Sequence, residues 1–131
     1  DVLSKGDFQH IALANPKTAP YGAAAMETLK NMGLLEKAQA KVVQGENIAQ
    51  THQFVSTGSA ELGFVALSQV FKDGKLTNGS AWIVPEKNYS PIRQDAIILN
   101  KGRNNPGAIA LMSYLKGEKA RVIIRSFGYE L

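Results

Sequence analysis

The sequence contains no cysteine, a single tryptophan and only two histidines among its 131 residues. The lack of cysteine excludes disulfide bonds and thiolate metal sites, and it leaves the redox compartment open. His10 and His52 lie in different predicted elements without the spacing of metal ligands, so each is expected to have a packing or surface role. The sequence also has no Gly-x-Ser-x-Gly elbow and no phosphate-binding loop of the Walker type. We therefore expect the protein not to be an enzyme.

Long hydrophobic runs are absent as well. No apolar stretch approaches the roughly 20 residues that a membrane-spanning helix requires. Residues 1–6 have neither the basic start nor the apolar core of a signal peptide, and the chain does not begin with methionine. We interpret the first residue as a processing boundary and expect the chain to be a piece of a longer protein. Hydrophobic residues make up 44% of the chain and charged residues 20%, which is typical of one globular domain with a core.

The excess of positive charge is small. The net charge is +4, and the lysines and arginines are spread along the chain apart from a modest C-terminal cluster. Mild basicity suits a protein with an anionic ligand, although a solvated basic surface explains the same charge. No basic helix is interleaved with aromatic residues and no motif that reads bases is present, so nucleic-acid binding is not expected.

Apolar runs alternate with helix-start signals along the chain. Strands are expected at residues 8–14, 41–44, 62–67, 80–84 and 95–99. Helices are expected to start at Pro20, after Asn47, at Pro106 and after Gly117. This alternation predicts an α/β fold, in which helices flank a largely parallel mixed sheet in a lobe of three layers.

Apolar residues in three of these elements are expected to be buried. Trp82 looks like a core residue. Leu29 falls at helical spacing on the inner face of the helix that starts at Pro20. Leu111 and Leu115 fall on the face of a later helix that the same spacing predicts to be buried.

Two segments in the first half of the chain each lead from a predicted strand into a helix start. In one, Pro20 occupies the first helical position and Tyr21 follows it; in the other, Asn47 caps a helix that begins with Ile48. The N–H groups of a first helical turn are free and the helix dipole favours negative charge there. In parallel sheets, ligands bind outside the carboxyl ends of the strands, where both turns are expected. Tyr21 and Ile48 are therefore candidate residues of a small-oxyanion site, although surface packing for Tyr21 and a core position for Ile48 remain open.

The runs IALANPKTAPYGAAA, VVQGENIAQTHQFV, AELGFVALSQV, SAWIVPEKNYSPIRQDAIIL and SYLKGEKARVIIRSFGYEL together resemble, in order, the periplasmic molybdate-binding proteins of bacterial ABC transporters. The Pro-Tyr-Gly-Ala-Ala-Ala and Ser-Phe-Gly-Tyr-Glu segments are the most specific of them. This family consists of two-lobed type II periplasmic binding proteins that close on molybdate or tungstate. The resemblance implies a solute-binding protein of the periplasm that binds the oxyanion and delivers it to a permease.

The resemblance also implies that most of the first lobe is missing. Residues 1–86 match the second lobe, and residues 87–131 match the returning strand and C-terminal helices that normally complete the first lobe. The family's serine and threonine ligands have no counterparts in this chain. Two family ligand positions match Tyr21 and Ile48, the second through its backbone N–H group. No cofactor is implied beyond the molybdate or tungstate ligand itself.

The chemistry of the two turns agrees with this resemblance. Molybdate at neutral pH is a fully deprotonated dianion, so its site needs only hydrogen-bond donors. A protonated phosphate needs an acceptor, and the nearest carboxylates to the two turns are those of Glu46 and Glu27.

Three alternatives remain open for the function. They are a sulfate-type or other oxyanion receptor, the effector-sensing domain of a transcription regulator of the same architecture, and an α/β enzyme. The enzyme alternative would need Glu46 and His52 in one cleft.

Three arrangements remain open for the apolar C-terminal segment. It is expected to fold back on the rest of the chain, to pair with a neighbouring chain in a homodimer, or to swap between chains.

Overall fold

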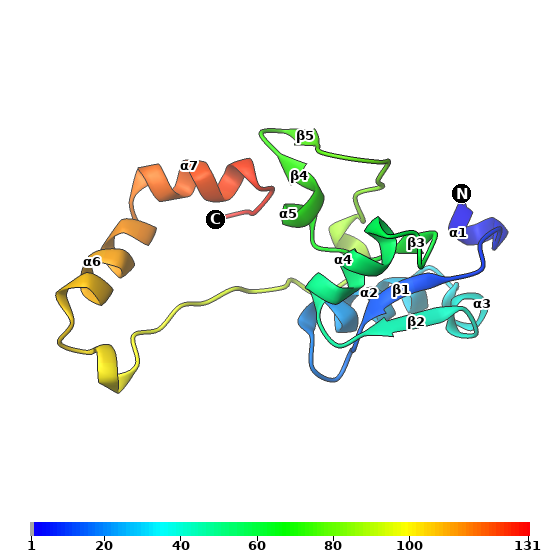
Figure 1. The fold of residues 1–131 in the computed structure, drawn as a ribbon, viewed down its shortest axis with the longest axis horizontal. Helices are drawn as coiled ribbons and strands as arrows, with labels where there is room; N and C mark the ends of the chain where they lie inside the picture. The colour runs from blue at the N-terminus through cyan, green and yellow to red at the C-terminus, as the bar shows by residue number, and fades with distance from the viewer. Residues whose placement is uncertain (1) are drawn as a thin grey trace.

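A parallel sheet of three strands organises the N-terminal half of the chain, of which the computed structural model describes residues 2–131. The strand order is β2 (Val42–Gly45), β1 (Ile11–Ala14) and β3 (Leu62–Gly63), so that the first strand lies in the centre (Figure 1). All four residues of β1 are buried, which accounts for its uninterrupted apolar sequence. The predicted α/β fold with a parallel sheet flanked by helices is confirmed.

Helices cover both faces of this sheet. α2 (Pro20–Asn31) follows β1, and α4 (Ile48–Ser56) follows β2. Along the chain, β1 is followed by β2 on one side of it, and β2 is followed by β3 on the other side of β1. Because the two connections run in opposite directions across the sheet, right-handed crossovers place α2 and α4 on opposite faces. The side chains of β1 agree: Leu13 belongs to the core beneath α2, whereas Ala12 lies on the side of Val55 in α4.

The hydrophobic core lies between the sheet, α2 and α3 (Leu35–Gln39). Its buried residues are Phe8, Ile11, Leu13, Ala25, Leu29, Leu34 and Ala38. Fully burying one leucine or isoleucine side chain stabilises a fold by about 1.5–3 kcal/mol. This core therefore holds α2, with Tyr21 near its start, firmly on the sheet.

The predicted helix starts are confirmed. α2 begins at Pro20, α4 begins directly after Asn47, and α6 (Pro106–Leu115) begins at its predicted proline. Asn105 caps α6 by accepting hydrogen bonds from two N–H groups of its first turn. α7 (Glu118–Ser126) follows a glycine, as predicted. The remaining elements are short: α1 (Val2–Lys5), α5 (Leu67–Val70), β4 (Phe71–Lys72), β5 (Lys75–Leu76), and the 3-10 helices η1 (Glu86–Asn88) and η2 (Asn100–Gly102).

Two predicted strands do not form. Residues 80–84 and 95–99 have no strand neighbour within residues 2–131, and β3 ends at Gly63, four residues before its predicted end. A strand exists only where a second strand receives its backbone hydrogen bonds, and an apolar sequence cannot supply that neighbour. The three-stranded sheet is accordingly parallel throughout, and the antiparallel pair β4–β5 stands apart from it. The prediction that Trp82 lies in the core is wrong, because its side chain is 54% exposed.

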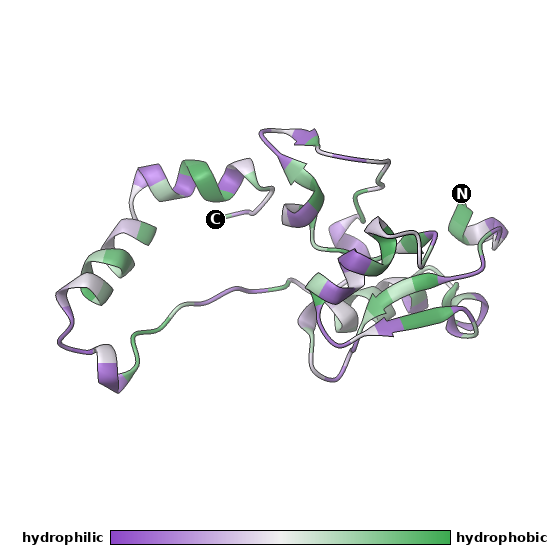
Figure 2. Cartoon of the chain, viewed as in Figure 1, coloured by the Kyte–Doolittle hydropathy of each residue, from purple (hydrophilic) through white to green (hydrophobic). Residues whose placement is uncertain are grey.

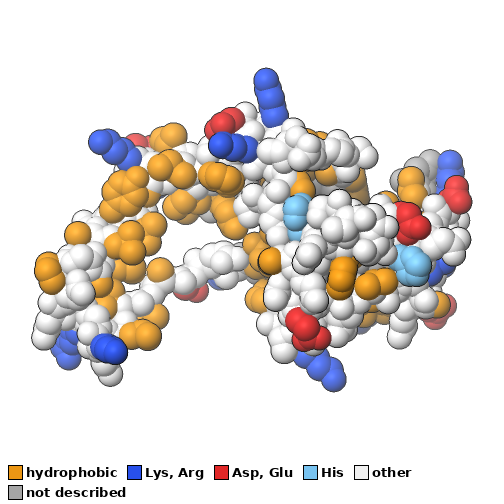
Figure 3. All heavy atoms as spheres, viewed as in Figure 1, with side chains coloured by type: hydrophobic (Ala, Val, Ile, Leu, Met, Phe, Trp, Pro, Cys, Tyr) orange, Lys and Arg blue, Asp and Glu red, His pale blue; other side chains and the backbone are white. Residues whose placement is uncertain are grey.

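The last part of the chain forms an arm, defined here as residues 95–131. Figure 1 shows the arm leaving the rest of the molecule, hereafter the body, carrying α6 and α7, and returning beside α5. Figures 2 and 3 show strongly hydrophobic stretches in the arm and hydrophobic side chains gathered along it. Leu111 and Leu115 are 57% and 37% exposed, so the prediction that this face of α6 is buried is wrong. Among residues 2–131, none of the helices combines the length and the hydropathy that crossing a membrane requires.

Candidate functional site

The first turns of α2 and α4 lie at the same edge of the sheet. The register pairs Ala14, the last residue of β1, with Gly45, the last residue of β2. Just beyond this pair, the N–H group of Asn15 donates to the carbonyl of Gly45 at 2.7 Å. Adjacent strands whose connections leave to opposite faces create a crevice at the carboxyl edge, which is where open α/β sheets bind ligands. The structure thus brings the helix starts at Tyr21 and Ile48 to one edge of the sheet, and their role in binding stays a prediction.

Two glycines allow both helix starts to approach the strand ends closely. A Cβ atom on Gly22 would lie 2.1 Å from the carbonyl oxygen of Ala14. A Cβ atom on Gly45 would lie 2.7 Å from Oγ1 and 2.9 Å from the backbone nitrogen of Thr51. No other residue type fits such contacts without a shift of the backbone. The first turns of α2 and α4 are therefore pressed against the paired ends of β1 and β2.

Three backbone N–H groups at these helix starts have no hydrogen-bond partner within residues 2–131. They belong to Tyr21, Ile48 and Ala49. Pro20 carries no N–H group, and the two N–H groups after Tyr21 both donate to the carbonyl of Ala19. Free N–H groups and the positive ends of two helix dipoles attract an anion without a charged side chain.

Side chains at the start of α4 bind other N–H groups and leave those of Ile48 and Ala49 free. The Asn47 side chain accepts a hydrogen bond from the N–H group of Gln50 at 2.9 Å. The Gln50 side chain in turn accepts one from the N–H group of Glu46 at 2.7 Å. This reciprocal capping fixes the first turn of α4 in place.

Gln69 links the start of α4 to α5, and sequence reasoning missed it. Its Nε2 donates to the carbonyl of Ile48 at 3.1 Å, and its Oε1 accepts from the N–H group of Ala66 at 3.0 Å. Gln69 is the third residue of α5, a position from which glutamine side chains return to the helix start. That signal was present in the sequence, but it did not reveal the contact with Ile48.

The hydroxyl group of Tyr21 joins three distant parts of the chain. It accepts a hydrogen bond from Nε2 of Gln94 at 3.2 Å, and the hydroxyl group of Tyr129 lies beside it. The Tyr129 hydroxyl is also 3.0 Å from Oγ of Ser68. Burial, followed by the neighbouring Tyr129, raises the pKa of Tyr21 to about 12. Sequence reasoning missed Gln94 and Tyr129 at Tyr21, and Ser68 at Tyr129, because no local pattern relates these residues to one another.

The raised pKa of Tyr21 predicts a loss of stability at high pH. Tyr21 ionises near pH 10 in the unfolded chain but only near 12 in the folded protein, so the unfolded state loses its proton first. We expect the free energy of unfolding of the wild type, relative to Tyr21→Phe, to be constant below about pH 9. It should then fall between about pH 10 and 12, as measured by urea denaturation of both proteins. A difference that does not change with pH would contradict this account.

The two histidines and Glu46 belong to no group within residues 2–131 that could hold a metal ion. His10 is exposed, with its Nδ1 4.0 Å from Oε2 of Glu61. No hydrogen bond or ion pair joins Glu46 to His52 in the described chain. Residues 2–131 also contain no group of three or more histidine, aspartate or glutamate side chains that could hold a metal ion.

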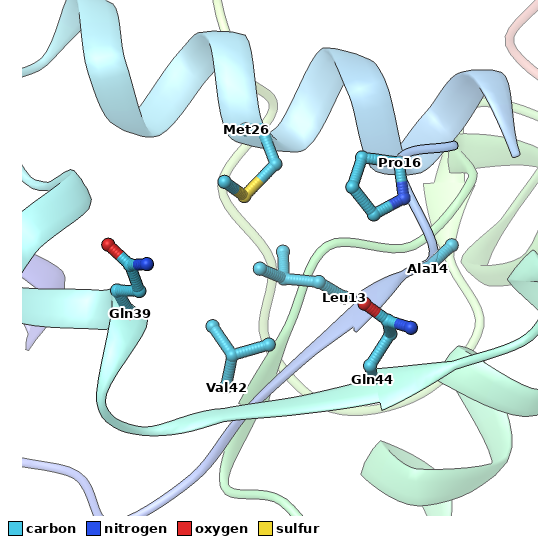
Figure 4. A pocket seen from close by; sticks show the side chains of 7 residues that line it. All are labelled: Leu13, Ala14, Pro16, Met26, Gln39, Val42 and Gln44. Carbon is cyan, nitrogen blue, oxygen red and sulfur yellow. The ribbon is translucent and has the colours of Figure 1, made fainter. Parts of the chain in front are cut away.

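A cavity of about 210 Å³ lies between α2 and the outer strand β2 (Figure 4). Its lining residues are Leu13, Ala14, Pro16, Met26, Gln39, Val42 and Gln44. Figure 4 shows the side chains of Leu13, Met26 and Val42 pointing toward a common space, with the two glutamine side chains on either side. None of its lining residues belongs to the first turn of α2 or α4, so the free N–H groups at the two helix starts are the better candidate for binding an anion.

Comparison with known proteins gives consistent matches along the chain. Residues 1–130 match a family model described as bacterial extracellular solute-binding protein. The molybdate-binding protein ModA of Azotobacter vinelandii is 62% identical over 130 residues, which cover 99% of this chain and 52% of that protein. ModA of Rhodobacter capsulatus is 46% identical over 129 residues, which cover 98% of this chain and 50% of that protein.

A solved structure agrees with these matches. The periplasmic molybdate-binding protein of Azotobacter vinelandii matches with a TM-score of 0.92 and 40% sequence identity, covering 100% of this chain and 58% of that one. The α/β arrangement of the chain is therefore that of a periplasmic binding protein. The chain spans about half the length of the curated relatives it matches.

Proposed function

Because the chain belongs to the family of bacterial extracellular solute-binding proteins, we propose that it binds molybdate or tungstate for an ABC importer. The unpaired N–H groups of Tyr21 and Ile48 hold the oxyanion. The observation that carries this proposal is that two helix starts with free N–H groups lie at the same carboxyl edge of the sheet. The names of relatives at 62% and 46% identity support molybdate as the ligand.

The site has the chemistry that a fully deprotonated dianion requires. Its groups are backbone donors, and the amide of Gln69 is already bonded to the backbone. Glu46 has an exposed side chain. A ligand with a proton of its own, such as hydrogen phosphate, finds no acceptor at the free N–H groups themselves. Selection for molybdate over phosphate follows from this set of donors.

We further propose that the chain acts in the periplasm as part of a longer two-lobed receptor. Residues 1–86 make one lobe, and residues 87–131 complete the other. The receptor passes its oxyanion to the permease subunits of the transporter. The length of the relatives and the exposed apolar residues of the arm support this arrangement.

A titration followed by NMR tests the proposed ligand even where binding is weak. We expect the backbone amide resonances of Tyr21, Ile48 and Ala49 to shift when molybdate is added to the chain. Sulfate should cause smaller shifts at equal concentration, and phosphate the smallest. Unchanged amide resonances at these positions in millimolar molybdate would refute the site.

Replacing Ile48 with proline removes one proposed donor with little change in the fold. Proline is tolerated at the first position of a helix, and Asn47 before it already has the extended backbone that proline requires, with φ −150° and ψ 172°. A charge-assisted hydrogen bond contributes about 1.5–3 kcal/mol, so molybdate affinity should fall about 10- to 100-fold. Calorimetric or NMR titration measures this change.

Ile48→Val is the matched control, because it keeps the N–H group and shortens the side chain by one methylene. We expect Ile48→Val to bind molybdate as the wild type does. Equal affinity in the proline and valine variants would mean that the N–H group of residue 48 does not touch the ligand.

A further inference from the structure

Residues 88–94 form a strap that lies along α2. Four hydrogen bonds attach the strap from the C-terminal toward the N-terminal end of the helix. Asn31 Nδ2 donates to the carbonyl of Asn88 at 3.0 Å, and Gln94 Nε2 donates to the Tyr21 hydroxyl at 3.2 Å. Between them, the N–H group and the hydroxyl of Ser90 donate to Oε2 and Oε1 of Glu27 at 2.8 and 3.0 Å. The hydrogen bond from Gln94 to Tyr21 lies directly before the arm, which begins at residue 95. The strap thus ends at the first turn of α2, beside the proposed oxyanion site.

The tail of the arm, residues 126–129, returns to the same place. The N–H group of Asp73 donates to the carbonyl of Ser126 at 2.9 Å. Gly128 packs so tightly that a Cβ atom there would lie 2.6 Å from Cδ2 of Leu67. These contacts dock the tail on α5 and β4 and bring Tyr129 between Ser68 and Tyr21.

Both connections between the arm and the body therefore meet at one hydroxyl group. We infer that Gln94 and Tyr129 are positioning residues for the oxyanion site. Gln94 donates a hydrogen bond to the Tyr21 hydroxyl, and Tyr129, bonded to Ser68, lies beside that hydroxyl, so that together they fix the first turn of α2. This inference rests on the proposed function. Among the residues that the structure describes, the N–H group of Tyr21 is the one in that turn without a partner, since Pro20 has no N–H group and the two that follow are bonded.

The physical benefit of this arrangement is preorganisation. A donor that is ordered before the ligand arrives loses less conformational entropy on binding, so the affinity is higher. Linkage makes the effect reciprocal: an anion on the Tyr21 N–H group also favours the docked position of the strap and the tail. The fraction of molecules in which the strap and the tail are docked therefore increases when the site is occupied.

Removing the Tyr129 hydroxyl tests the inference. We expect Tyr129→Phe to weaken molybdate binding about two- to tenfold, the range that one neutral hydrogen bond spans. Tyr21→Phe should weaken binding at least as much, because it also removes the acceptor for Gln94, and the double variant should bind no more weakly than Tyr21→Phe. The pKa of Tyr21, followed by NMR of its ring carbon, should fall in Tyr129→Phe, a change that a loss of stability elsewhere would not produce.

Tyr114→Phe is the matched control, because Tyr114 lies on α6 with its side chain 48% exposed. Molybdate binding in this control should equal that of the wild type. If the wild type responds to molybdate and Tyr129→Phe binds as tightly as the control, the positioning role is wrong and the proposed function stands. If the wild type itself does not respond, the proposed function fails and the inference fails with it. Additive losses in the double variant would also overturn the inference.

Discussion

Gly22→Ala is expected to destabilise the protein by about 2–3 kcal/mol and to abolish its response to molybdate. The added Cβ atom would lie 2.1 Å from the carbonyl oxygen of Ala14 and 2.9 Å from the carbonyl carbon of Asn15. Both are backbone atoms of the strand end and its loop, so no side-chain rotation can relieve the contact. The first turn of α2 must move away from the sheet, and the N–H group of Tyr21 moves with it. Urea denaturation and a molybdate titration measure the two losses.

Gly102→Ala is a suitable control for this substitution. The atom nearest to a Cβ on Gly102 is Cγ2 of Ile98 at 3.4 Å, an ordinary van der Waals contact. Its effect on the free energy of unfolding should stay within about 0.5 kcal/mol. If Gly22→Ala were no more harmful than this control, the close contact between α2 and β1 would not exist in solution.

Local signals in the sequence were sufficient to place the helix starts. Pro20, Asn47 and Asn105 act through atoms within one helical turn: a fixed φ and a side-chain acceptor for first-turn N–H groups. The parallel sheet followed from the alternation of strands and helices, and the common edge followed from the sheet. The positions of the two helix starts in the candidate site could therefore be predicted from the sequence.

The contacts of the Tyr21 side chain could not be predicted in this way. Gln94 and Tyr129 reach Tyr21 only because the strap follows α2 and the tail docks on α5, and both are tertiary events. The Ser-Phe-Gly-Tyr-Glu segment, which contains Tyr129, resembles the family closely. A resemblance of this kind does not tell which residues lie next to Tyr129 in the folded protein. The same limit applies to residues 80–84 and 95–99, where apolar character predicts strands but no second strand lies beside them within residues 2–131.

Leu29→Ala is expected to cost about 2–5 kcal/mol, whereas Leu111→Ala should change stability by no more than about 0.5 kcal/mol. Helical spacing predicted both leucines to be buried, yet Leu29 has 0% of its side chain exposed and Leu111 has 57%. Removing the Leu29 side chain leaves a cavity against Ile11 and Leu13, while Leu111 loses contact mainly with water. Urea denaturation of the two variants measures the difference directly. Equal losses of unfolding free energy in the two variants would mean that in solution α6 is covered by a surface outside this chain, such as a second copy. The helical spacing of α6 would then have predicted a buried face correctly.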